Sequence, residues 1–235
     1  MGVADSVRAR LPEQSVLKSL SDEELNGLFA FGVTRRLGRG DVLFERGDPG
    51  DSMMVVLTGT LKAAATTAQG REVVFDYIGP GGVVGEIALL DGESRTARVV
   101  AMEPAEVVVL QRRFLMPWLD RHRGAALRII QVLCRKLRRT NALVEDHAGL
   151  AMGPKLARGL LRLAEEHGIR KDGRVSFNFP ISQGDIGGYV SLSRENVNRQ
   201  LREWTAAGYI ELDHGKIAIV DHEALDAIAD AEGVD

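Results

Sequence analysis

The chain has 235 residues, of which 45% are hydrophobic and 27% charged, as in an ordinary globular protein of one large or two small domains. No apolar run approaches the roughly 18 residues that span a membrane, and Met1–Arg10 lacks the apolar core of a signal peptide. We therefore expect a cytoplasmic protein without a membrane partner. The net charge of −3 means that any basic, nucleic-acid-binding surface must be local.

Residues with catalytic or metal-binding chemistry are sparse and scattered. Cys134 is the only cysteine, which excludes an intrachain disulfide and a four-cysteine zinc or iron–sulfur site within one chain. The five histidines form no metal-spaced pattern with glutamate, and there is no Ser-His-Asp arrangement or Walker loop. We expect no enzyme, no metal site and no prosthetic group.

The first 111 residues predict a β-rich domain that follows a short helix. Ser21 and Glu24 have the spacing of a capping box, which predicts a helix after Ser21. From Val33 to Gln111, short β-rich runs alternate with glycine turns, the pattern of an antiparallel sandwich or barrel. We take residues 1–111 as this domain.

The stretch from Gly85 to Ala97 has the features of a phosphate site. A glycine turn leads into a short apolar helical turn, whose first backbone N–H groups can bind an anion. Arg95 can clamp a phosphate, Thr96 adds a hydroxyl, and Glu86 can accept from sugar hydroxyls. The predicted nucleotide-contacting residues here are Gly85, Glu86, Ile87, Ala88, Arg95 and Thr96.

Helical periodicity follows, over residues 112–149. Seven positions are spaced 3, 4, 3, 4, 3 and 4 apart: Leu127, Ile130, Cys134, Leu137, Asn141, Val144 and Ala148. This heptad seam favours a parallel homodimer, and the alternative is one helix packed on its own β-domain. Asn141 can set the register of the pair, and Thr140 and Asn141 also carry groups that can hydrogen-bond a nucleobase.

Residues 154–235 predict a DNA-binding domain after a hinge at 150–153. Pro154 is expected at the first position of a helix, and a short strand is expected at Arg174–Phe179. Ser182 can cap a short helix, and a second helix from about Ser193 completes a helix-turn-helix. Its exposed face predicts the DNA contacts Ser193, Arg194, Glu195, Asn198 and Arg199. Tyr209–Val220 alternates around His214-Gly215, as a wing hairpin would.

These motifs resemble, in order and spacing, those of the cAMP receptor protein/fumarate–nitrate regulator family, over roughly residues 15–222. Gly85-Glu86 followed by Arg95-Thr96 resembles its phosphate-binding cassette. Ser193-Arg194-Glu195-Asn196-Val197-Asn198-Arg199 resembles the recognition helix of its cAMP receptor protein branch. Thr140-Asn141 lies where that branch contacts adenine. One departure is Ser191, which replaces the usual turn glycine.

The resemblance implies an α+β fold: an antiparallel β-roll that binds a cyclic nucleotide, a long dimerisation helix and a C-terminal winged helix-turn-helix. It implies a homodimeric transcription regulator that binds double-stranded DNA at pseudo-palindromes with TGTGA-like half-sites. The allosteric ligand would be cAMP, and RNA polymerase would be a partner. Guanine-selective relatives use a Thr at the position of Thr96, so cGMP is a second candidate ligand.

Two other readings stay open at this point. The same DNA-binding scaffold could sense a haem-bound gas or a small metabolite, although the set Glu86, Arg95 and Thr96 would then have no phosphate to bind. A nucleotide-binding regulatory subunit of a kinase or channel would not need the helix-turn-helix.

The heptad seam gives the first testable prediction. Leu137→Glu should convert the dimer to a monomer, because a two-fold interface would bury the unpaired carboxylate twice. Sedimentation velocity of both proteins at micromolar concentration measures this. A wild-type protein that sediments as a monomer would contradict the dimer.

Overall fold

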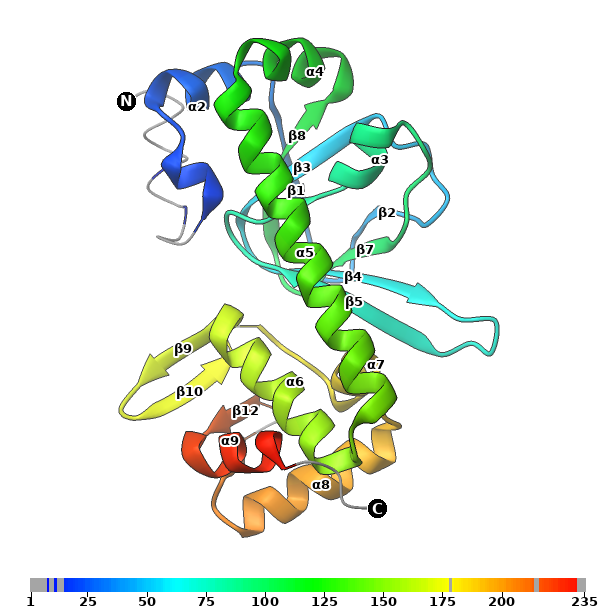
Figure 1. Cartoon of the computed structure of the whole chain (residues 1–235), viewed down its shortest axis with the longest axis vertical. Helices are drawn as coiled ribbons and strands as arrows, with labels where there is room; N and C mark the ends of the chain where they lie inside the picture. Colours follow the sequence, from blue (N-terminus) through cyan, green and yellow to red (C-terminus); the bar gives the residue numbers. More distant parts are fainter. Residues whose placement is uncertain (1–7, 9–10, 12–14, 178, 214–215, 232–235) are drawn as a thin grey trace. The chain divides into compact units, whose positions relative to one another are not determined.

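The computed structural model describes residues 8, 11, 15–177, 179–213 and 216–231 (Figure 1). These residues form two compact units, and each is described by itself below. The N-terminal unit comprises Met1–Ala65 and Phe75–Arg138, and the C-terminal unit comprises Thr66–Val74 and Arg139–Asp235. The chain passes between the units after Ala65, after Val74 and, inside a long helix, after Arg138. The domain limits stated above from the sequence stay predictions.

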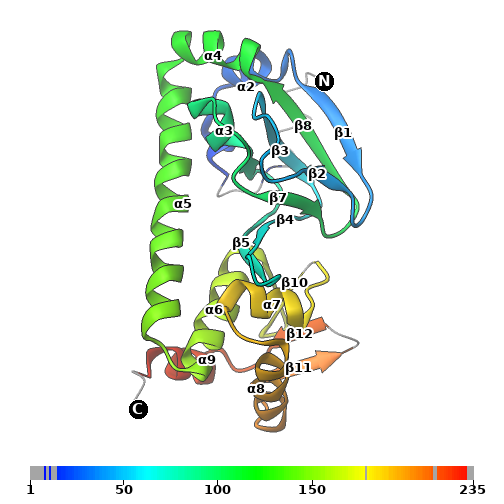
Figure 2. The same cartoon turned by 90° about the vertical axis from the view of Figure 1, so that its right-hand side faces the viewer.

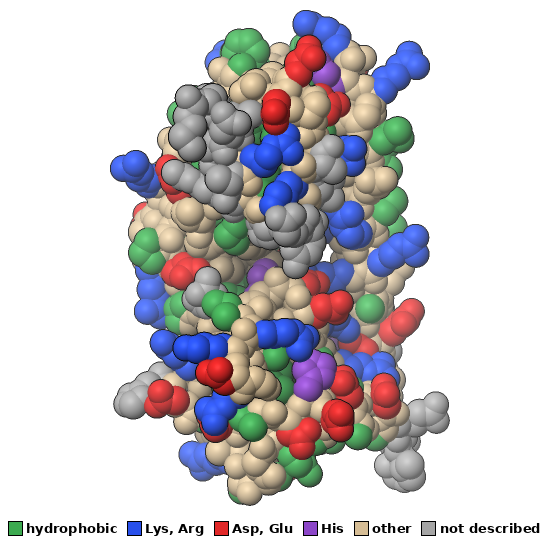
Figure 3. Space-filling model, turned by 90° about the vertical axis from the view of Figure 1, so that its left-hand side faces the viewer, with side chains coloured by type: hydrophobic (Ala, Val, Ile, Leu, Met, Phe, Trp, Pro, Cys, Tyr) green, Lys and Arg blue, Asp and Glu red, His purple; other side chains and the backbone are tan. Residues whose placement is uncertain are grey.

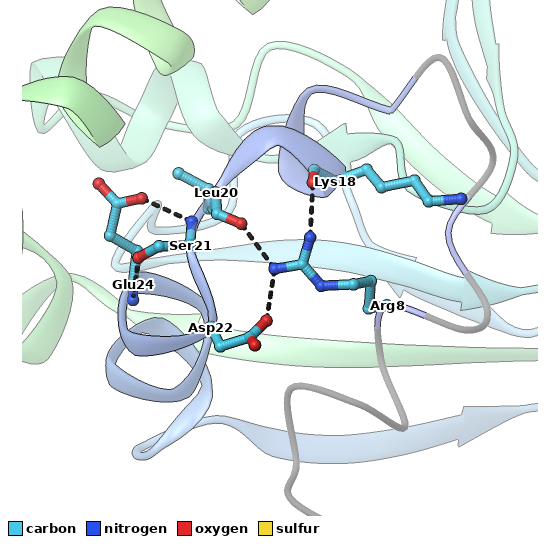
Figure 4. Close-up of polar contacts among 6 residues, drawn as sticks. All are labelled: Arg8, Lys18, Leu20, Ser21, Asp22 and Glu24. Atoms are coloured by element: carbon cyan, nitrogen blue, oxygen red, sulfur yellow. Dashed lines mark hydrogen bonds and ion pairs between the residues drawn. The ribbon is translucent and has the colours of Figure 1, made fainter.

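The N-terminal unit opens with a 3₁₀ helix η1 (Val16–Ser19) and helix α2 (Asp22–Phe29). The predicted capping box at Ser21 is confirmed: Ser21 Oγ accepts from the Glu24 amide at 3.1 Å, and the Glu24 carboxylate accepts from the Ser21 amide at 2.8 Å (Figure 4). Arg8 donates to the Lys18 and Leu20 carbonyls and pairs with Asp22. The amides at the start of α2 and the carbonyls of the residues just before it thus have hydrogen-bond partners.

Two four-stranded sheets make up the β-roll. The first has the order β1 (Val33–Leu37), β8 (Ala105–Gln111), β3 (Ser52–Thr58), β6 (Val83–Val84). The second has the order β2 (Val42–Phe44), β7 (Arg98–Ala101), β4 (Leu61–Thr66), β5 (Glu72–Ile78). The β1–β8, β3–β8 and β4–β7 ladders are antiparallel, as the short glycine-punctuated runs predict.

Strand β3 explains why the core of this unit has two parts. Successive side chains of a strand point to opposite faces. Met53 and Val55 therefore join a cluster that contains α2 and α4 (Arg112–Arg121), while Met54 and Val56 join the cluster between the sheets. With both faces covered, β3 is buried from Ser52 to Leu57.

Helix α5 (Arg123–Gly149) is one continuous helix of 27 residues (Figures 1 and 2). The large apolar side chains of its predicted seam are uncovered: Leu127 is 60% exposed, Leu137 61% and Val144 61%. Among the described residues, no helix is long and apolar enough to cross a membrane. An apolar stripe at heptad spacing on such a helix suits a partner helix.

The C-terminal unit packs helices on a small sheet. Its elements are α6 (Met152–His167), β9 (Gly168–Lys171), β10 (Arg174–Phe177), α7 (Gln183–Val190), α8 (Arg194–Ala206), β11 (Ile210–Asp213), β12 (Lys216–Ile219) and α9 (His222–Asp230). The sheet order is β11-β12-β10-β9. Strands β11 and β12 pair as the predicted wing requires, whereas the turn itself, His214-Gly215, lies outside the described residues.

Two details of this unit differ from the sequence-based expectation. Helix α6 begins at Met152 with Ala151 as an N-cap that makes no side-chain bond, so Pro154 is its third residue and not its first. Proline fits there because amides of the first turn have no helical acceptor. The sequence predicts only one strand between α6 and α7, whereas a second one, β9, precedes it; Gly168–Lys171 has no apolar alternation that would predict a strand.

The helix-turn-helix depends on two backbone positions. Ser191 ends α7 in the left-handed region, with φ 56°. Its Oγ lies 3.2 Å from His147 Nδ1. A Cβ at Gly187 would lie 2.6 Å from the Leu192 carbonyl oxygen, so the turn can fold back only over a glycine.

This close approach predicts unequal effects of alanine at two glycines of α7. Gly187→Ala should lower the free energy of unfolding by about 1–3 kcal/mol, because the new methyl group meets the backbone of the turn. In Gly184→Ala, the Cβ has its nearest neighbour 3.6 Å away, so this control should be neutral or stabilising by up to about 1 kcal/mol. Urea unfolding at equal protein concentration compares them. Equal destabilisation of both variants would contradict this account of the turn.

Candidate nucleotide site and DNA-reading helix

The predicted cassette folds around helix α3 (Glu86–Asp91). Gly85 is its N-cap, with φ 82°, and a Cβ there would lie 2.5 Å from Arg95 Nη1. Only glycine therefore allows the arginine to approach the start of the helix. The loop after α3 returns because the Arg95 amide donates to the Asp48 carbonyl at 2.9 Å and the Gly47 amide to the Arg95 carbonyl at 2.9 Å.

Arg95 lies under this turn and is only 3% exposed. Its Nη1 donates to the carbonyls of Ser52 at 2.6 Å and Gly85 at 2.9 Å, and Nη2 donates to Ser52 Oγ at 3.0 Å. The guanidinium stacks on the Phe44 ring, 4.4 Å from its centre. The Nε atom is buried and has no hydrogen-bond partner among the described residues.

The charge of Arg95 is only partly balanced. Burial lowers its pKa, while the negative charges of Asp51, Asp48 and Glu86 act in the opposite direction without cancelling the shift. A guanidinium still keeps its proton at neutral pH. A desolvated cation with an unused N–H beside the first turn of a helix fits a bound anion. A phosphate provides both the negative charge that balances the cation and an oxygen that accepts from the N–H.

Glu86, the first residue of α3, is buried and already paired. Its side chain is 3% exposed, and Oε1 accepts from Lys136 Nζ of helix α5 at 2.9 Å. Lys136 also donates to the Val83 carbonyl at 2.8 Å. The carboxylate retains a second oxygen and further lone pairs, so it can also accept from a sugar hydroxyl.

The remaining predicted ligand contacts lie in different surroundings. Ala88 is 2% exposed and packs inward, whereas Ile87 is 42% exposed and Thr96 is exposed. Thr140 and Asn141 are exposed on α5, in the part that belongs to the C-terminal unit. The structure thus brings Gly85, Glu86 and Arg95 together, and the base contacts of Thr140 and Asn141 stay predictions.

The predicted DNA contacts lie on α8. Arg194, Glu195 and Arg199 are exposed, while the Ser193 hydroxyl caps the helix by accepting from the Asn196 amide at 3.2 Å. Asn198 is half-buried. Bonds to the Glu195 backbone and to Ser193 lower the pKa of the Glu195 carboxyl, so it stays ionised.

Arg199 is held before any DNA is bound. Its Nη2 lies 3.3 Å from Asn196 Oδ1 and 3.6 Å from the Met152 sulfur. On the face drawn in Figure 3, basic and acidic side chains of the described residues are interspersed.

Comparison with known families agrees with this arrangement. Residues 34–122 match the cyclic nucleotide-binding domain family, and residues 154–228 match the Crp-like helix-turn-helix domain family. The two families together cover both motifs identified above. The chain belongs to the cAMP receptor protein/fumarate–nitrate regulator family.

Known proteins of this family resemble the chain along most of its length. A "CRP-like cAMP-activated global transcriptional regulator" of Mycobacterium tuberculosis is 29% identical over 80% of this chain and 84% of its own. A "Cyclic AMP receptor protein" of Thermus thermophilus is 26% identical over 89% and 94%. The structure of FixK2 from Bradyrhizobium japonicum has a TM-score of 0.76 at 19% identity, covering 86% of this chain and 99% of that one, which supports the fold.

The chain is therefore a DNA-binding transcription regulator with a cyclic nucleotide-binding domain, and not an enzyme.

The sequence analysis missed three residues that surround the cassette: Phe44, Ser52 and Lys136. Lys136 is 50 positions from Glu86. No local spacing marks such a contact, so only the packing of α5 on the β-roll reveals it.

The Glu86–Lys136 pair gives a prediction for the protein without ligand. Lys136→Met should lower the free energy of unfolding by about 2 kcal/mol, because it leaves a buried carboxylate without its cation. The partial exposure of Lys136, at 29%, keeps the effect below that of a fully buried pair.

Urea unfolding at a fixed protein concentration measures the effect. The exposed neighbour Arg135 supplies the control, and Arg135→Met should change stability by less than about 0.5 kcal/mol. The double variant with Glu86→Gln should regain part of the loss. If Lys136→Met is as stable as Arg135→Met, the pair contributes nothing.

Proposed function

We propose that this regulator binds cAMP in the cassette and then binds pseudo-palindromic DNA as a homodimer. Arg95 holds the cyclic phosphate and Glu86 the ribose, and neither group distinguishes adenine from guanine. Base selection then falls to Thr140 and Asn141, which can accept from the adenine amino group. cGMP is expected to bind with comparable affinity through Thr96 and to activate equally or less.

The observation that carries this proposal is the state of Arg95. A buried guanidinium with a depressed pKa and an unused Nε is costly unless an anion completes it. Its position beside the free amides of α3 supports a phosphate in particular. The paired carboxylate Glu86 in the same turn supports a sugar phosphate over inorganic phosphate.

The dimer is supported by the uncovered seam of α5. Leu127, Ile130, Leu137 and Val144 are each more than half exposed in the single chain, and Cys134 is exposed between them. Burying such a stripe against a second copy removes apolar surface from water. A two-fold dimer would also present two copies of α8 to two half-sites about one DNA turn apart.

Calorimetric titration with cAMP and cGMP tests the ligand. The wild type should bind both, and Arg95→Gln should weaken cAMP binding at least about tenfold through the loss of a charged phosphate contact. Arg98→Gln is the matched control, since Arg98 follows the cassette but its side chain is 43% exposed and pairs with Glu45. It should change affinity less than about twofold.

DNA binding completes the same experiment. Fluorescence anisotropy on a duplex with TGTGA-like half-sites should show tighter binding when cAMP is present, and Arg95→Gln should lose that response. Melting temperatures establish that the variants are folded. Absence of cAMP binding to the wild type, or equal DNA affinity with and without cAMP, refutes the proposal.

A further inference from the structure

The last three turns of α5 show a second face within the C-terminal unit. Arg139, Leu143 and Asp146 are spaced four and three residues apart, so they share one side of the helix. The predicted dimer position Asn141 is about 200° around the axis from Arg139, on the opposite side. Leu143 and Asp146 are buried, at 8% and 6% exposed.

This inner face is bonded to helices α6 and α7. Arg139 pairs with Glu166 of α6, and its Nη2 donates to the Tyr189 hydroxyl of α7 at 2.9 Å. Asp146 accepts from Arg162 at 2.6 Å and from Arg158 at 3.2 Å, both on α6. We call these residues the α5–α7 network: Arg139, Asp146, Arg158, Arg162, Glu166 and Tyr189.

Tyr189 lies at the centre of this network. Its side chain is fully buried in the helix-turn-helix core, yet its hydroxyl reaches Arg139 on α5. Burial raises the pKa of the Tyr189 hydroxyl, and the charge and hydrogen bond of Arg139 oppose that rise without cancelling it. The hydroxyl therefore keeps its proton at neutral pH and accepts from Arg139 as a neutral group.

The network fixes one arrangement of the three helices. Burial lowers the pKa of Arg162, but the hydrogen bond that Arg162 donates to Asp146 and its interactions with Tyr189 more than offset this, so the net shift is upward. Buried charges lose much of their stabilisation when a partner moves away, so rotating α5 against α7 would be costly. Helix α6 is also locked to α7, because Gly159 allows Val190 to pack where any Cβ would overlap it.

We propose that Tyr189 is a positioning residue that couples α5 to the recognition helix, by making the end of α5 and the helix-turn-helix one rigid body. Arg139 directly precedes Thr140 and Asn141, so a shift of these residues on ligand binding moves the helix-turn-helix through the Tyr189 contact. Gly187 and Ser191 then carry that movement into α8 through the tight turn. The inference rests on the proposed cyclic-nucleotide response.

The first test compares two Tyr→Phe variants of the full chain, each of which removes one hydroxyl from the same unit. In the wild type, cAMP raises DNA affinity by some factor, measured by anisotropy. Tyr189→Phe should reduce that factor at least about fivefold while cAMP affinity, measured by calorimetry, stays within about twofold. Tyr209→Phe, beyond α8, should keep the wild-type factor. A purely structural role would change melting temperature without changing this ratio.

A second measurement uses no ligand and therefore separates failure of this inference from failure of the proposed function. Hydrogen–deuterium exchange of the apo protein should be faster at residues 139–149 in Tyr189→Phe than in the wild type, and unchanged at 123–135. Arg139→Met should reproduce both effects, and the double variant should be no worse than Arg139→Met alone, because Arg139 and Tyr189 share one contact.

The outcomes decide between the two proposals. If the wild type does not respond to cAMP, the proposed function fails and the exchange data alone judge the network. If Tyr189→Phe keeps either the wild-type cAMP factor or the wild-type exchange at 139–149, the coupling role of Tyr189 is overturned.

Discussion

The Glu86 carboxylate lies 2.9 Å from the Lys136 ammonium inside the N-terminal unit, and this ion pair joins the turn of the cassette to helix α5. Burying a charged carboxylate is costly unless a cation pairs with it, and the Glu86 side chain is only 3% exposed. The pair therefore adds to the apolar contacts of Ala125, Ala126 and Ile129 that hold the first half of α5 on the β-roll. It also leaves the second Glu86 oxygen available beside Arg95, so that a single buried acid serves both the fold and the ligand site.

Helix α5 serves three surfaces, and its length makes this possible. Lys136 faces the cassette, and Leu137 and Val144 form an uncovered apolar stripe. Arg139 and Asp146 face helix α6, and Arg139 also bonds to α7. A helix repeats every 3.6 residues, so three faces can be kept apart over 27 residues. The compact units divide between Arg138 and Arg139, directly before the residues proposed to contact the base.

Arginines are used in two different ways in the two units. Arg95 is buried with an unused Nε and a depressed pKa, as suits a group that awaits an anion. Arg162 is half-buried beside Asp146 and has a raised pKa, as suits a cation whose partner is already part of the chain. An arginine is thus a candidate ligand contact at position 95 and a structural ion-pair partner at position 162. The difference is whether the fold places a carboxylate in direct contact with the guanidinium.

The sequence by itself determined what depends on neighbouring residues. The capping box at Ser21, the helix cap at Ser182, the glycine turn before α3, and the two helices of the helix-turn-helix follow from hydrogen bonds and periodicity within a few residues. The phosphate-binding cassette and the recognition helix, in that order along the chain, were also enough to predict the family. Even Ser191, which departs from the usual glycine, adopts the left-handed turn that its position requires.

Only the tertiary structure decided which distant side chains meet. Nothing in the sequence around Lys136 or Tyr189 marks the partner of either residue, and only the packing of the helices brings Lys136 to Glu86 and Tyr189 to Arg139. Arg95 was recognisable as a phosphate ligand, but its burial on Phe44 and Ser52 was not. Such contacts join positions dozens of residues apart, and local spacing carries no record of them because they depend on how whole elements pack.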